Sequence, residues 1–450
     1  MRGTAAMAIA TVAFCMIGSA QAESFKQALV KAYRGNPTLQ AERARQRGTD
    51  ELVPAAKSGW RPTVNAQGEI SGTYSNSDPG RSGSDAMPKS ISIQLAQPLF
   101  RGFKTVEGIK QAKETVRAGR QGVLVVEQDV LLRTTEAYLD VIRDRQILNL
   151  RQQNVSNLQR QANAAKARFD AGEVTRTDVS QARARVSGAK AQVASARASL
   201  AESTARYVAL VGHEPDKLAT PPSAKNPKSL GAAIDIARAA NPNILAAVHT
   251  QLAQEHAVEV TKGDLLPSAS LEAFAQTVDH PSAGTNSSTN ASIAGVLNVP
   301  LYEAGRVYSA VRQAKQLESQ RRIEIVAAGR SVVQGVTSAW NFVAAAREAI
   351  VSAKAQVAAS SEALNGVRQE YLVGSRSTID VLNAEQEMIN ARVSVVSAEH
   401  DLVLASYQLQ AAIGRMTARQ LGLAGPYYDV EENYEQVKNK WIGLDADTLE

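Results

Sequence analysis

The sequence has almost no cysteine, few aromatic residues and no long apolar run after its first residues. Cys15 is the only cysteine among 450 residues, and it lies inside the apolar N-terminal segment. If that segment is removed as a leader, the mature chain can form no disulfide, thiolate metal site or cysteine nucleophile. The chain is only 5% aromatic. This scarcity, together with abundant alanine, favours an elongated shape built from closely packed helices over a bulky globular interior.

No dense block of one charge is present either. Lys and Arg total 50 and Asp and Glu total 44, and the two signs are interspersed. Because nucleic-acid binding requires a basic patch or stripe, no nucleic-acid partner is expected. The sequence also has no glycine-rich phosphate loop, no G-x-S-x-G elbow and no H-E-x-x-H zinc motif. We therefore expect neither an enzyme nor a bound cofactor.

A metal site is not expected. Five histidines are scattered along the chain, at His213, His249, His256, His280 and His400. His249 and His256 are seven residues apart and could share a helix face, but no close carboxylate or third imidazole completes a site in the sequence.

The first residues have the pattern of a secretory signal. Met1-Arg2 precedes an apolar run from Ala5 to Ile17, and small residues end at Ala22. This predicts a signal peptide at 1–22 with cleavage before Glu23. A transmembrane anchor is the alternative, but the run is shorter than the about 20 apolar residues that span a bilayer. Beyond residue 22 no apolar stretch is long enough for a helical span, so any membrane passage would use strands.

The rest of the chain contains an internal duplication, and the two copies are about 200 residues apart. The recurring pairs are Asn36-Pro37 with Asn241-Pro242, Gln97-Pro98-Leu99-Phe100 with Val299-Pro300-Leu301-Tyr302, Asp178-Val179 with Asp380-Val381, and Gly212 with Gly414. We predict a first repeat at 23–214, a linker at 215–229, a second repeat at 230–414 and an unduplicated tail at 415–450.

Each repeat is expected to contain short helices and then a strand pair, at about 62–100 and about 267–301. Apolar and polar residues alternate there with the period of a strand, most faintly in 268–278, and polar loops are expected at 75–88 and 279–288. The polar faces include Gln67, Glu69, Ser92, Gln94 and Asn290. Four strands cannot close their edges in a bilayer, so several chains must combine. Two chains would give eight strands and three would give twelve with a wet lumen.

Long helical hairpins are predicted after the strands, at about 104–212 with a tip near 172 and at about 303–414 with a tip near 374. Apolar residues recur at alternating steps of three and four, as in Val179, Ala182, Val186 and Ala189. This is the seam of a coiled coil. The 67 residues of 104–170 would form a helix about 100 Å long, with shorter helices stacked along it.

This order of elements resembles the TolC family of outer-membrane efflux proteins, from about residue 24 to residue 414. The resemblance implies a mainly α protomer that gives four strands to a trimeric twelve-stranded β-barrel and its hairpins to a coiled-coil helical tunnel. It implies an exit duct of a tripartite efflux or type I secretion system in the outer membrane of a Gram-negative bacterium. Drugs, toxic compounds or secreted proteins would pass from an inner-membrane pump of the RND or ABC type, joined by a periplasmic adaptor. The alternative is a periplasmic adaptor or scaffold, which should carry one hairpin rather than two.

The resemblance also implies a gate at the helical tips. Tyr371 would bond to Asp178 and Arg376 would bond to Thr177, which would hold the tunnel end shut. The structural alternative is that Asp178 and Thr177 cap the start of a helix, while Tyr371 fills a seam position and Arg376 is a solvated loop charge.

Four further tip residues match positions of the family. Asp380 would form a constriction ring that attracts cations, or would only cap a helix. Asn383 stands where the family has a second acidic ring, so the expected negative charge is weaker. Gly172 and Gly374 would form the tip turns, with the positive φ that glycine allows, and would contribute to adaptor docking.

Overall fold

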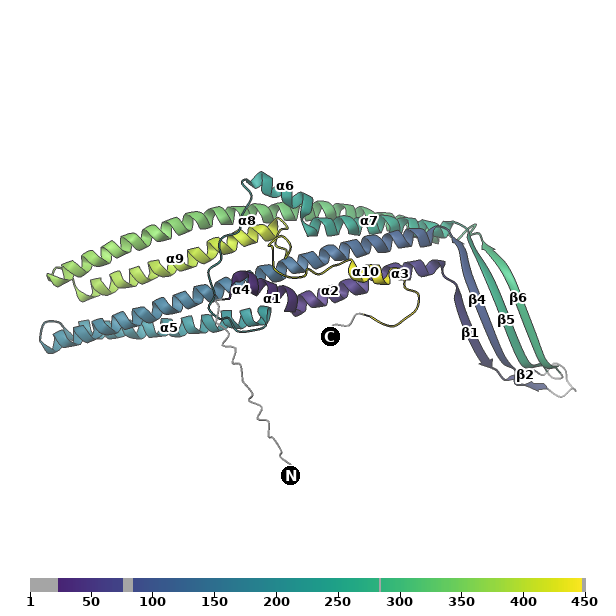
Figure 1. Cartoon of the computed structure of the whole chain (residues 1–450), viewed down its shortest axis with the longest axis horizontal. Coiled ribbons are helices and arrows are strands. Elements are labelled where there is room, and N and C mark those ends of the chain that lie inside the picture. The colour runs from purple at the N-terminus through teal and green to yellow at the C-terminus, as the bar shows by residue number, and fades with distance from the viewer. Residues whose placement is uncertain (1–22, 76–83, 283–284, 447–450) are drawn as a thin grey trace, which may run out of the picture.

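The molecule is elongated, with long helices at one end and a sheet at the other (Figure 1). It is seen in a computed structural model that describes residues 23–75, 84–282 and 285–446, so the predicted signal peptide lies outside the described residues. The prediction of a mainly α chain with a small antiparallel sheet is confirmed.

Both repeats run from short helices through strands to a long helical hairpin, and the first repeat has one more short helix and two more short strands. The first contains α1 (Phe25–Gly35), α2 (Pro37–Asp50), α3 (Leu52–Lys57), the 3-10 helix η1 (Ser58–Trp60), β1 (Thr63–Ile70), β2 (Thr73–Ser75), β3 (Ser84–Ala86), β4 (Lys89–Arg101), α4 (Lys104–Asp170) and α5 (Arg176–Val211). The second contains α6 (Leu230–Ala240), α7 (Pro242–Lys262), η2 (Gly263–Leu265), β5 (Ser268–Ser282), β6 (Thr285–Asn298), α8 (Arg306–Leu372) and α9 (Thr378–Ala412). The tail adds α10 (Glu432–Val437).

The duplicated Asn-Pro motif joins the short helices to the long hairpins. Asn36 Oδ1 accepts a hydrogen bond from the Thr38 amide at 3.0 Å, so it caps α2, and the proline that follows occupies the first turn. The side-chain amide of Asn36 also donates to the Leu210 carbonyl near the end of α5, at 3.3 Å. Asn241 repeats both bonds, and its amide donates to the Ala412 carbonyl at 2.9 Å. One residue thus starts a short helix and holds it against the end of a hairpin.

The four-stranded sheet has the order β1-β4-β5-β6, and every neighbouring pair is antiparallel. The prediction of a loop at 279–288 is wrong for most of that range, because β5 and β6 continue to pair as far as Ser282 and Thr285. A second short ribbon of β2 and β3 occupies part of the loop predicted at 75–88. Backbone pairing requires no alternation of apolar side chains, so the polar sequence concealed both extensions.

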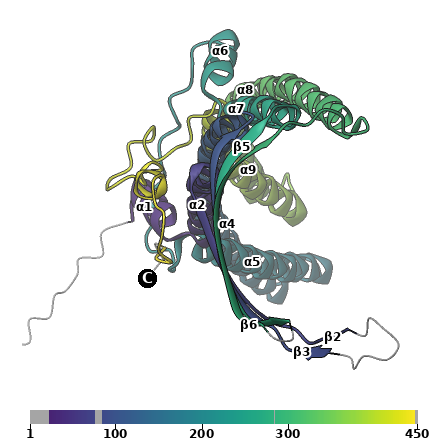
Figure 2. The same ribbon diagram turned by 90° about the vertical axis from the view of Figure 1, so that its right-hand side faces the viewer.

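The helices form one curved layer with α4 at its centre. Along α4, the neighbours are α2 and α7 in the half near the sheet and α5 and α9 in the other half, and α8 lies beside α7 and α9. The helices α1 and α6 and the tail lie on the convex side of this layer (Figure 2). The predicted seam is confirmed, because Val179, Ala182, Val186 and Ala189 are buried against α4 and α9.

The tail beyond residue 414 packs on α1 and α4 of the first repeat and on α9 of the second. Glu127 of α4 accepts a hydrogen bond from the Ala418 amide at 2.7 Å, and Arg120 of α4 pairs with Glu431 at 2.8 Å. Burial raises the pKa of Glu127, and the hydrogen bond from Ala418 opposes this. The tail therefore breaks the approximate symmetry between the two repeats.

A cluster of charges is buried where α4, α5 and α9 meet. His400 Nε2 lies 3.0 Å from Asp140 Oδ1, without hydrogen-bond alignment, and His400 Nδ1 lies 2.9 Å from Asp401 Oδ1. Arg143 and Arg206 also pair with Asp140, at 2.8 and 3.1 Å. Burial alone would lower the pKa of His400, but the two carboxylates outweigh it and raise that pKa. Burial alone would raise the pKa of Asp140, but its cationic neighbours lower it.

Replacing His400 with glutamine should make stability less dependent on pH. Because the pKa of His400 is raised in the folded chain, its contribution is fully present below the ordinary value of 6.5 and is lost as the pH rises through the raised pKa. We expect His400→Gln to cost about 1–3 kcal/mol at mildly acidic pH and less at alkaline pH. Thermal unfolding of the two proteins over this range measures the difference. Glu399→Gln, at an exposed neighbour on the same helix, is the control, and an equal loss at both ends of the range would contradict the assignment.

Candidate functional site

Both hairpin tips lie at the end of the molecule opposite the sheet (Figure 1). The first tip joins α4 to α5 and the second joins α8 to α9. Gly172 has φ +77° and Gly374 has φ +81°, and no atom lies within 4 Å of a Cβ built on either residue. The turns therefore need glycine for its left-handed backbone, not for close packing.

The predicted acidic residues begin the returning helices with capping boxes. Asp178 Oδ2 accepts hydrogen bonds from the amide and hydroxyl of Thr175, at 2.9 and 2.7 Å. Asp380 Oδ2 does the same with Ser377, at 2.9 and 2.6 Å. The hydroxyl and amide of Ser377 lower the pKa of Asp380, so this exposed carboxylate stays ionised. Asp178 and Asp380 therefore both have the helix-capping role that was the structural alternative to a gate or a constriction ring. Asp380 also keeps its negative charge.

Tyr371 joins the two hairpins, but through a residue that the sequence did not indicate. Arg168 in the last turn of α4 donates to Tyr371 Oη at 2.6 Å, and its guanidinium carbon lies 5.0 Å from the centre of the tyrosine ring. The Tyr371 hydroxyl also lies 3.4 Å from Thr378 Oγ1. Within this chain the hydroxyl of Tyr371 therefore bonds to Arg168 and not to the predicted Asp178, because the end of α4 places Arg168 beside it.

Arg376 forms its bond within its own tip. Its Nε donates to Glu370 Oε2 at 2.7 Å, a contact that raises the pKa of Arg376. Glu370 is the carboxylate that the tip turn brings back beside Arg376. Thr177 lies exposed in the first turn of α5, and the bond that the resemblance implies between Thr177 and Arg376 is not formed within this chain.

Two polar contacts behind the tips bind the hairpins together. Arg185 of α5 donates to Asn383 Oδ1 at 2.7 Å, so the residue at the second ring position is neutral and held by a cation. Glu385 of α9 is buried and accepts hydrogen bonds on Oε1 from Arg368 of α8, at 2.7 Å, and from Gln161 of α4. No pattern in the sequence distinguishes Arg168, Arg185 or Glu385 from other polar residues beside the seam.

A cavity of about 310 Å³ lies beside Tyr371. It is lined by residues of three helices, including Arg168 of α4, Arg368 of α8 and Val381 of α9. The hydroxyl of Tyr371 thus stands at a place where the helices are not fully packed, which leaves room for them to shift.

The histidines of α7 have carboxylate partners that the sequence analysis did not foresee. His249 Nδ1 lies 2.8 Å from Glu114, and His256 Nδ1 lies 2.8 Å from Glu107. Burial opposes ionisation of Glu107, but hydrogen bonds from Lys110 and His256 lower its pKa. Both the histidines and the glutamates are seven residues apart, which is the signal that would have predicted these pairs on antiparallel helices. In the described part of the chain no three His, Cys, Asp or Glu residues are placed to hold a metal ion.

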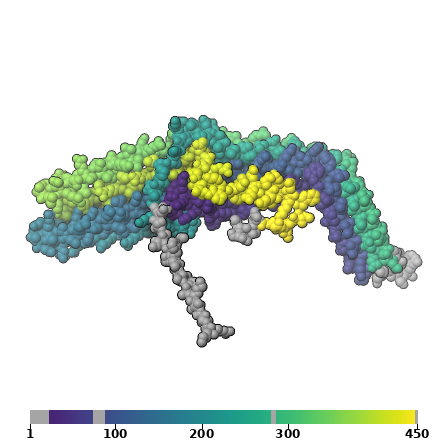
Figure 3. All heavy atoms as spheres, in the orientation of Figure 1, coloured from purple at the N-terminus to yellow at the C-terminus, as the bar shows by residue number. Residues whose placement is uncertain are grey.

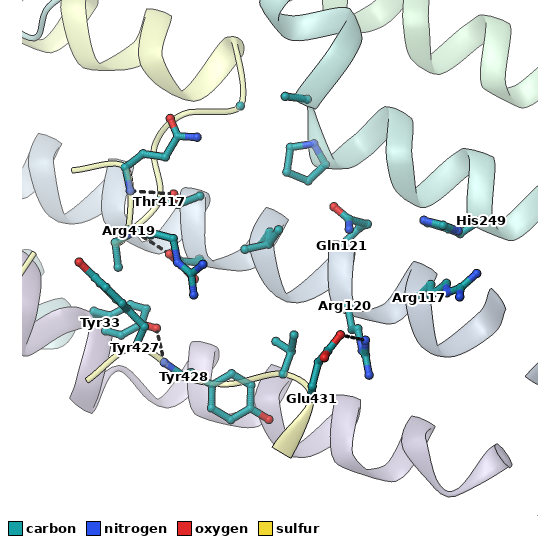
Figure 4. Close-up of a pocket in the computed structure, with 18 residues that line it drawn as sticks. Tyr33, Arg117, Arg120, Gln121, His249, Thr417, Arg419, Tyr427, Tyr428 and Glu431 are labelled. Carbon is teal, nitrogen blue, oxygen red and sulfur yellow. Dashed lines mark hydrogen bonds and ion pairs between the residues drawn. The ribbon is translucent and has the colours of Figure 1, made fainter. Parts of the chain in front are cut away.

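A cavity beside His249 lies under the tail. Figure 4 shows it between α4, α7 and the tail, with Arg120 paired to Glu431 at one side and His249 at another. Its volume is about 490 Å³. The Tyr428 amide donates to Tyr33 Oη at 2.9 Å, which ties the tail to α1 at its edge. This cavity belongs to the junction between the tail and the helices, far from the tips.

The sheet, at the opposite end, exposes large apolar side chains. Ile293 is 77% exposed and Val64 is 64% exposed. Among the helices that the structure describes, none combines the length and the apolar character needed to cross a membrane.

Comparisons with known proteins agree with this architecture. The family model described as outer membrane efflux protein matches residues 28–213 and 233–415, one match for each repeat. The outer membrane efflux protein BepC of Brucella suis is 40% identical over 431 residues, which are 95% of this chain and 93% of BepC. The outer membrane protein TolC of Escherichia coli is 27% identical over 420 residues, or 89% of this chain and 84% of TolC.

A solved structure shares the fold at lower identity. The CmeC outer membrane channel of Campylobacter jejuni superposes with a TM-score of 0.75 at 16% identity, over 92% of this chain and 89% of CmeC. The duplicated match, the identity to BepC and the shared fold have one explanation: the chain belongs to the outer membrane efflux protein family.

Proposed function

We propose that three copies of this chain form one duct through the outer membrane and that the helical tips gate its periplasmic end. The chain is an outer-membrane efflux channel, as its family and relatives are, and that family consists of channel proteins rather than enzymes. The comparisons support this function and not the alternative of a periplasmic adaptor or scaffold. The observation that carries the proposal is the division of the sheet into an apolar face and a polar face.

The strand register places apolar side chains on one continuous face. Val64 of β1 pairs with Leu95 of β4, Leu95 with Ala273 of β5, and Ala273 with Ile293 of β6. The same face carries Ala66, Gly68, Ile91, Ile93, Leu271, Ala275, Ala291, Gly295 and Leu297. From Ala269 to Thr277 this apolar face runs about 26 Å along β5 at about 3.3 Å per residue. Strands of a transmembrane barrel are tilted and cross the bilayer in about 9–11 residues, so this face, which ends at the polar Thr277, is about as long as a crossing strand needs.

The opposite face is polar, as a water-filled lumen requires. It carries the predicted residues Gln67, Glu69, Ser92, Gln94 and Asn290, and its apolar exceptions are Ala96, Phe274, Val278, Ala294 and Val296. In the described sheet β1 and β6 each have one unpaired edge. Hydrocarbon offers no partner for these backbone groups, so the edges must pair with other copies. Three copies give twelve strands, the number that the family implies for a homotrimer with an open lumen.

The tips supply the gate in this proposal. The bridge from Arg168 to Tyr371 ties one hairpin to the other, and Arg376 stiffens the second tip through Glu370. In the assembled duct Thr177 and Asp178, at the start of α5, face this second tip and complete the closure.

The ionised Asp380 forms a constriction ring that attracts cations. The pairing of Asn383 with Arg185 makes the next ring neutral or cationic, so cation selectivity is weaker than two acidic rings would give. Gly172 and Gly374 shape the exposed tips that dock a periplasmic adaptor and, through it, an inner-membrane pump of the RND or ABC type.

A charge on the apolar face should be far more costly than a charge on the polar face. Ile293→Arg places a cation in the middle of the apolar band and should cost about 2–4 kcal/mol of stability in lipid. Ser292→Arg, one residue earlier on the polar face, is the matched control and should change stability little. Urea unfolding of both variants in phospholipid vesicles measures the difference. Equal losses would mean that the apolar face does not contact lipid.

Loosening the tips should open the duct. Tyr371→Phe combined with Arg376→Ser removes the hydroxyl that Arg168 holds and the ion pair with Glu370. We expect single-channel conductance in planar bilayers to rise several-fold. Arg322→Gln, which breaks the ion pair with Glu318 in the part of α8 near the sheet, is the control. Unchanged conductance in the double variant would assign these side chains to packing and capping alone.

The number of copies has a direct measurement. Native mass spectrometry of protein extracted in detergent should give three protomers, because only repeated copies can satisfy the open edges of the sheet. Any other stable number would overturn the trimer.

A further inference from the structure

The last described residues carry three apolar side chains that no other described residue covers. Trp441 is 66% exposed, Ile442 is 91% exposed and Leu444 is 103% exposed. The tail brings them along the helices toward the base of the sheet (Figure 3). Isolated exposed apolar side chains are ordinary, but three within four residues, at a fixed place, indicate an interaction surface.

Two contacts fix this segment at the base of the sheet. Lys57, the last residue of α3, donates to the Lys438 carbonyl at 2.8 Å and to Asn439 Oδ1 at 2.7 Å. Arg61, two residues before β1, places its guanidinium 4.6 Å from the centre of the Trp441 ring. The segment is therefore docked on the protein, and only its apolar side chains are free.

The height of Trp441 relative to the apolar face follows from the strand register. Gln97 of β4 donates to the Trp60 carbonyl at 2.9 Å, which holds Trp60 and Arg61 beside Gln97. Gln97 pairs with Leu271 of β5, in the lowest part of the apolar face. Trp441, stacked on Arg61, thus lies level with the lower margin of that face.

Other exposed residues mark the same level as a membrane interface. Large apolar or aromatic side chains are exposed at the bases of the strands and in the turns beside them: Trp60, Phe103, Leu266, Leu301 and Tyr302. Aromatic girdles occupy this position in transmembrane barrels, where the rings lie at the level of the lipid headgroups. Trp441 and Ile442 extend this girdle outward from the sheet.

Cations surround the same segment. Partial burial lowers the pKa of Lys57, and the nearby positive charges of Lys113, Lys438 and Arg61 lower it further. The carboxylates beside the segment are already paired, Glu435 with Lys438 and Asp445 with Lys440, so the charges of Lys57, Lys113 and Arg61 favour an anionic partner. A surface that combines exposed apolar side chains with Lys and Arg is the pattern of a segment that lies in the membrane interface.

We propose that the tail segment 438–444 is an interfacial membrane anchor whose partner is the phospholipid of the periplasmic leaflet. Trp441, Ile442 and Leu444 enter the boundary between headgroups and acyl chains, and Lys57, Lys113 and Arg61 bind lipid phosphates. The anchor ties the unduplicated tail, and through it α2 and α4, to the membrane around the barrel. This proposal depends on the location of the protein in the outer membrane and not on the proposed gate.

Spin labelling of the full chain in vesicles of phosphatidylethanolamine and phosphatidylglycerol tests the anchor. Cys15 is the only cysteine, so Leu444→Cys in a Cys15→Ser background carries one nitroxide label. Ile293→Cys, on the apolar face, is the reference for lipid, and Glu173→Cys, at a helical tip, is the reference for water. Collisions of each label are measured with oxygen, which concentrates in lipid, and with a nickel chelate, which stays in water.

We expect oxygen collisions to exceed chelate collisions several-fold at positions 444 and 293, with the reverse at 173. A label at 444 that meets mainly the chelate, while the label at 293 meets mainly oxygen, would overturn the anchor and leave the sheet in the membrane. A label at 444 that meets neither reagent would show that an adjacent subunit covers the tail, and would also overturn the anchor. A label at 293 that meets mainly the chelate would overturn both the anchor and the placement of the sheet.

Discussion

The unpaired edges of the sheet are the constraint on which the rest of the structure depends. Within the described chain β1 and β6 each leave one row of backbone groups without a strand. Water can satisfy such groups but hydrocarbon cannot, and the apolar face of the same strands requires hydrocarbon. The two requirements are met together only when copies of the chain pair edge to edge. The proposed assembly of copies meets both requirements, and in it the polar face of the sheet lines the interior.

The helices extend the same geometry away from the membrane. Seven-residue seams rich in alanine let α5 and α9 lie close to the half of α4 near the tips, and α9 close to α8. Asn36 and Asn241 hold the short helices end to end against the hairpins, so the curved layer continues without a gap from the sheet to the tips. The tail departs from this repetition, because it is not duplicated and reaches the base of the sheet beside α3 of the first repeat.

At the tips, the residues that we propose as the gate also stabilise the helices. Asp178 and Asp380 begin their helices through capping boxes, so their carboxylates are partly engaged before any neighbour approaches. Tyr371 bonds to Arg168 across the two hairpins, beside the cavity of about 310 Å³. Few other polar bonds join the two hairpins. The bond between Arg168 and Tyr371 can therefore be replaced by other contacts at a small cost in free energy when the helices move.

The sequence alone determined the duplication, the strand and helix periods, the Asn-Pro caps and the positive-φ glycines, because each depends on residues close together in the chain. Its resemblance to a family also indicated the tips as the functional end. Tertiary structure decided which side chains meet: Arg168 with Tyr371, Arg185 with Asn383, and His249 and His256 with glutamates of α4. It also decided the extended β5 and β6 and the course of the tail. These depend on how separate helices and strands are placed side by side, and a short polar side chain gives no sign in the sequence of the partner that packing will bring to it.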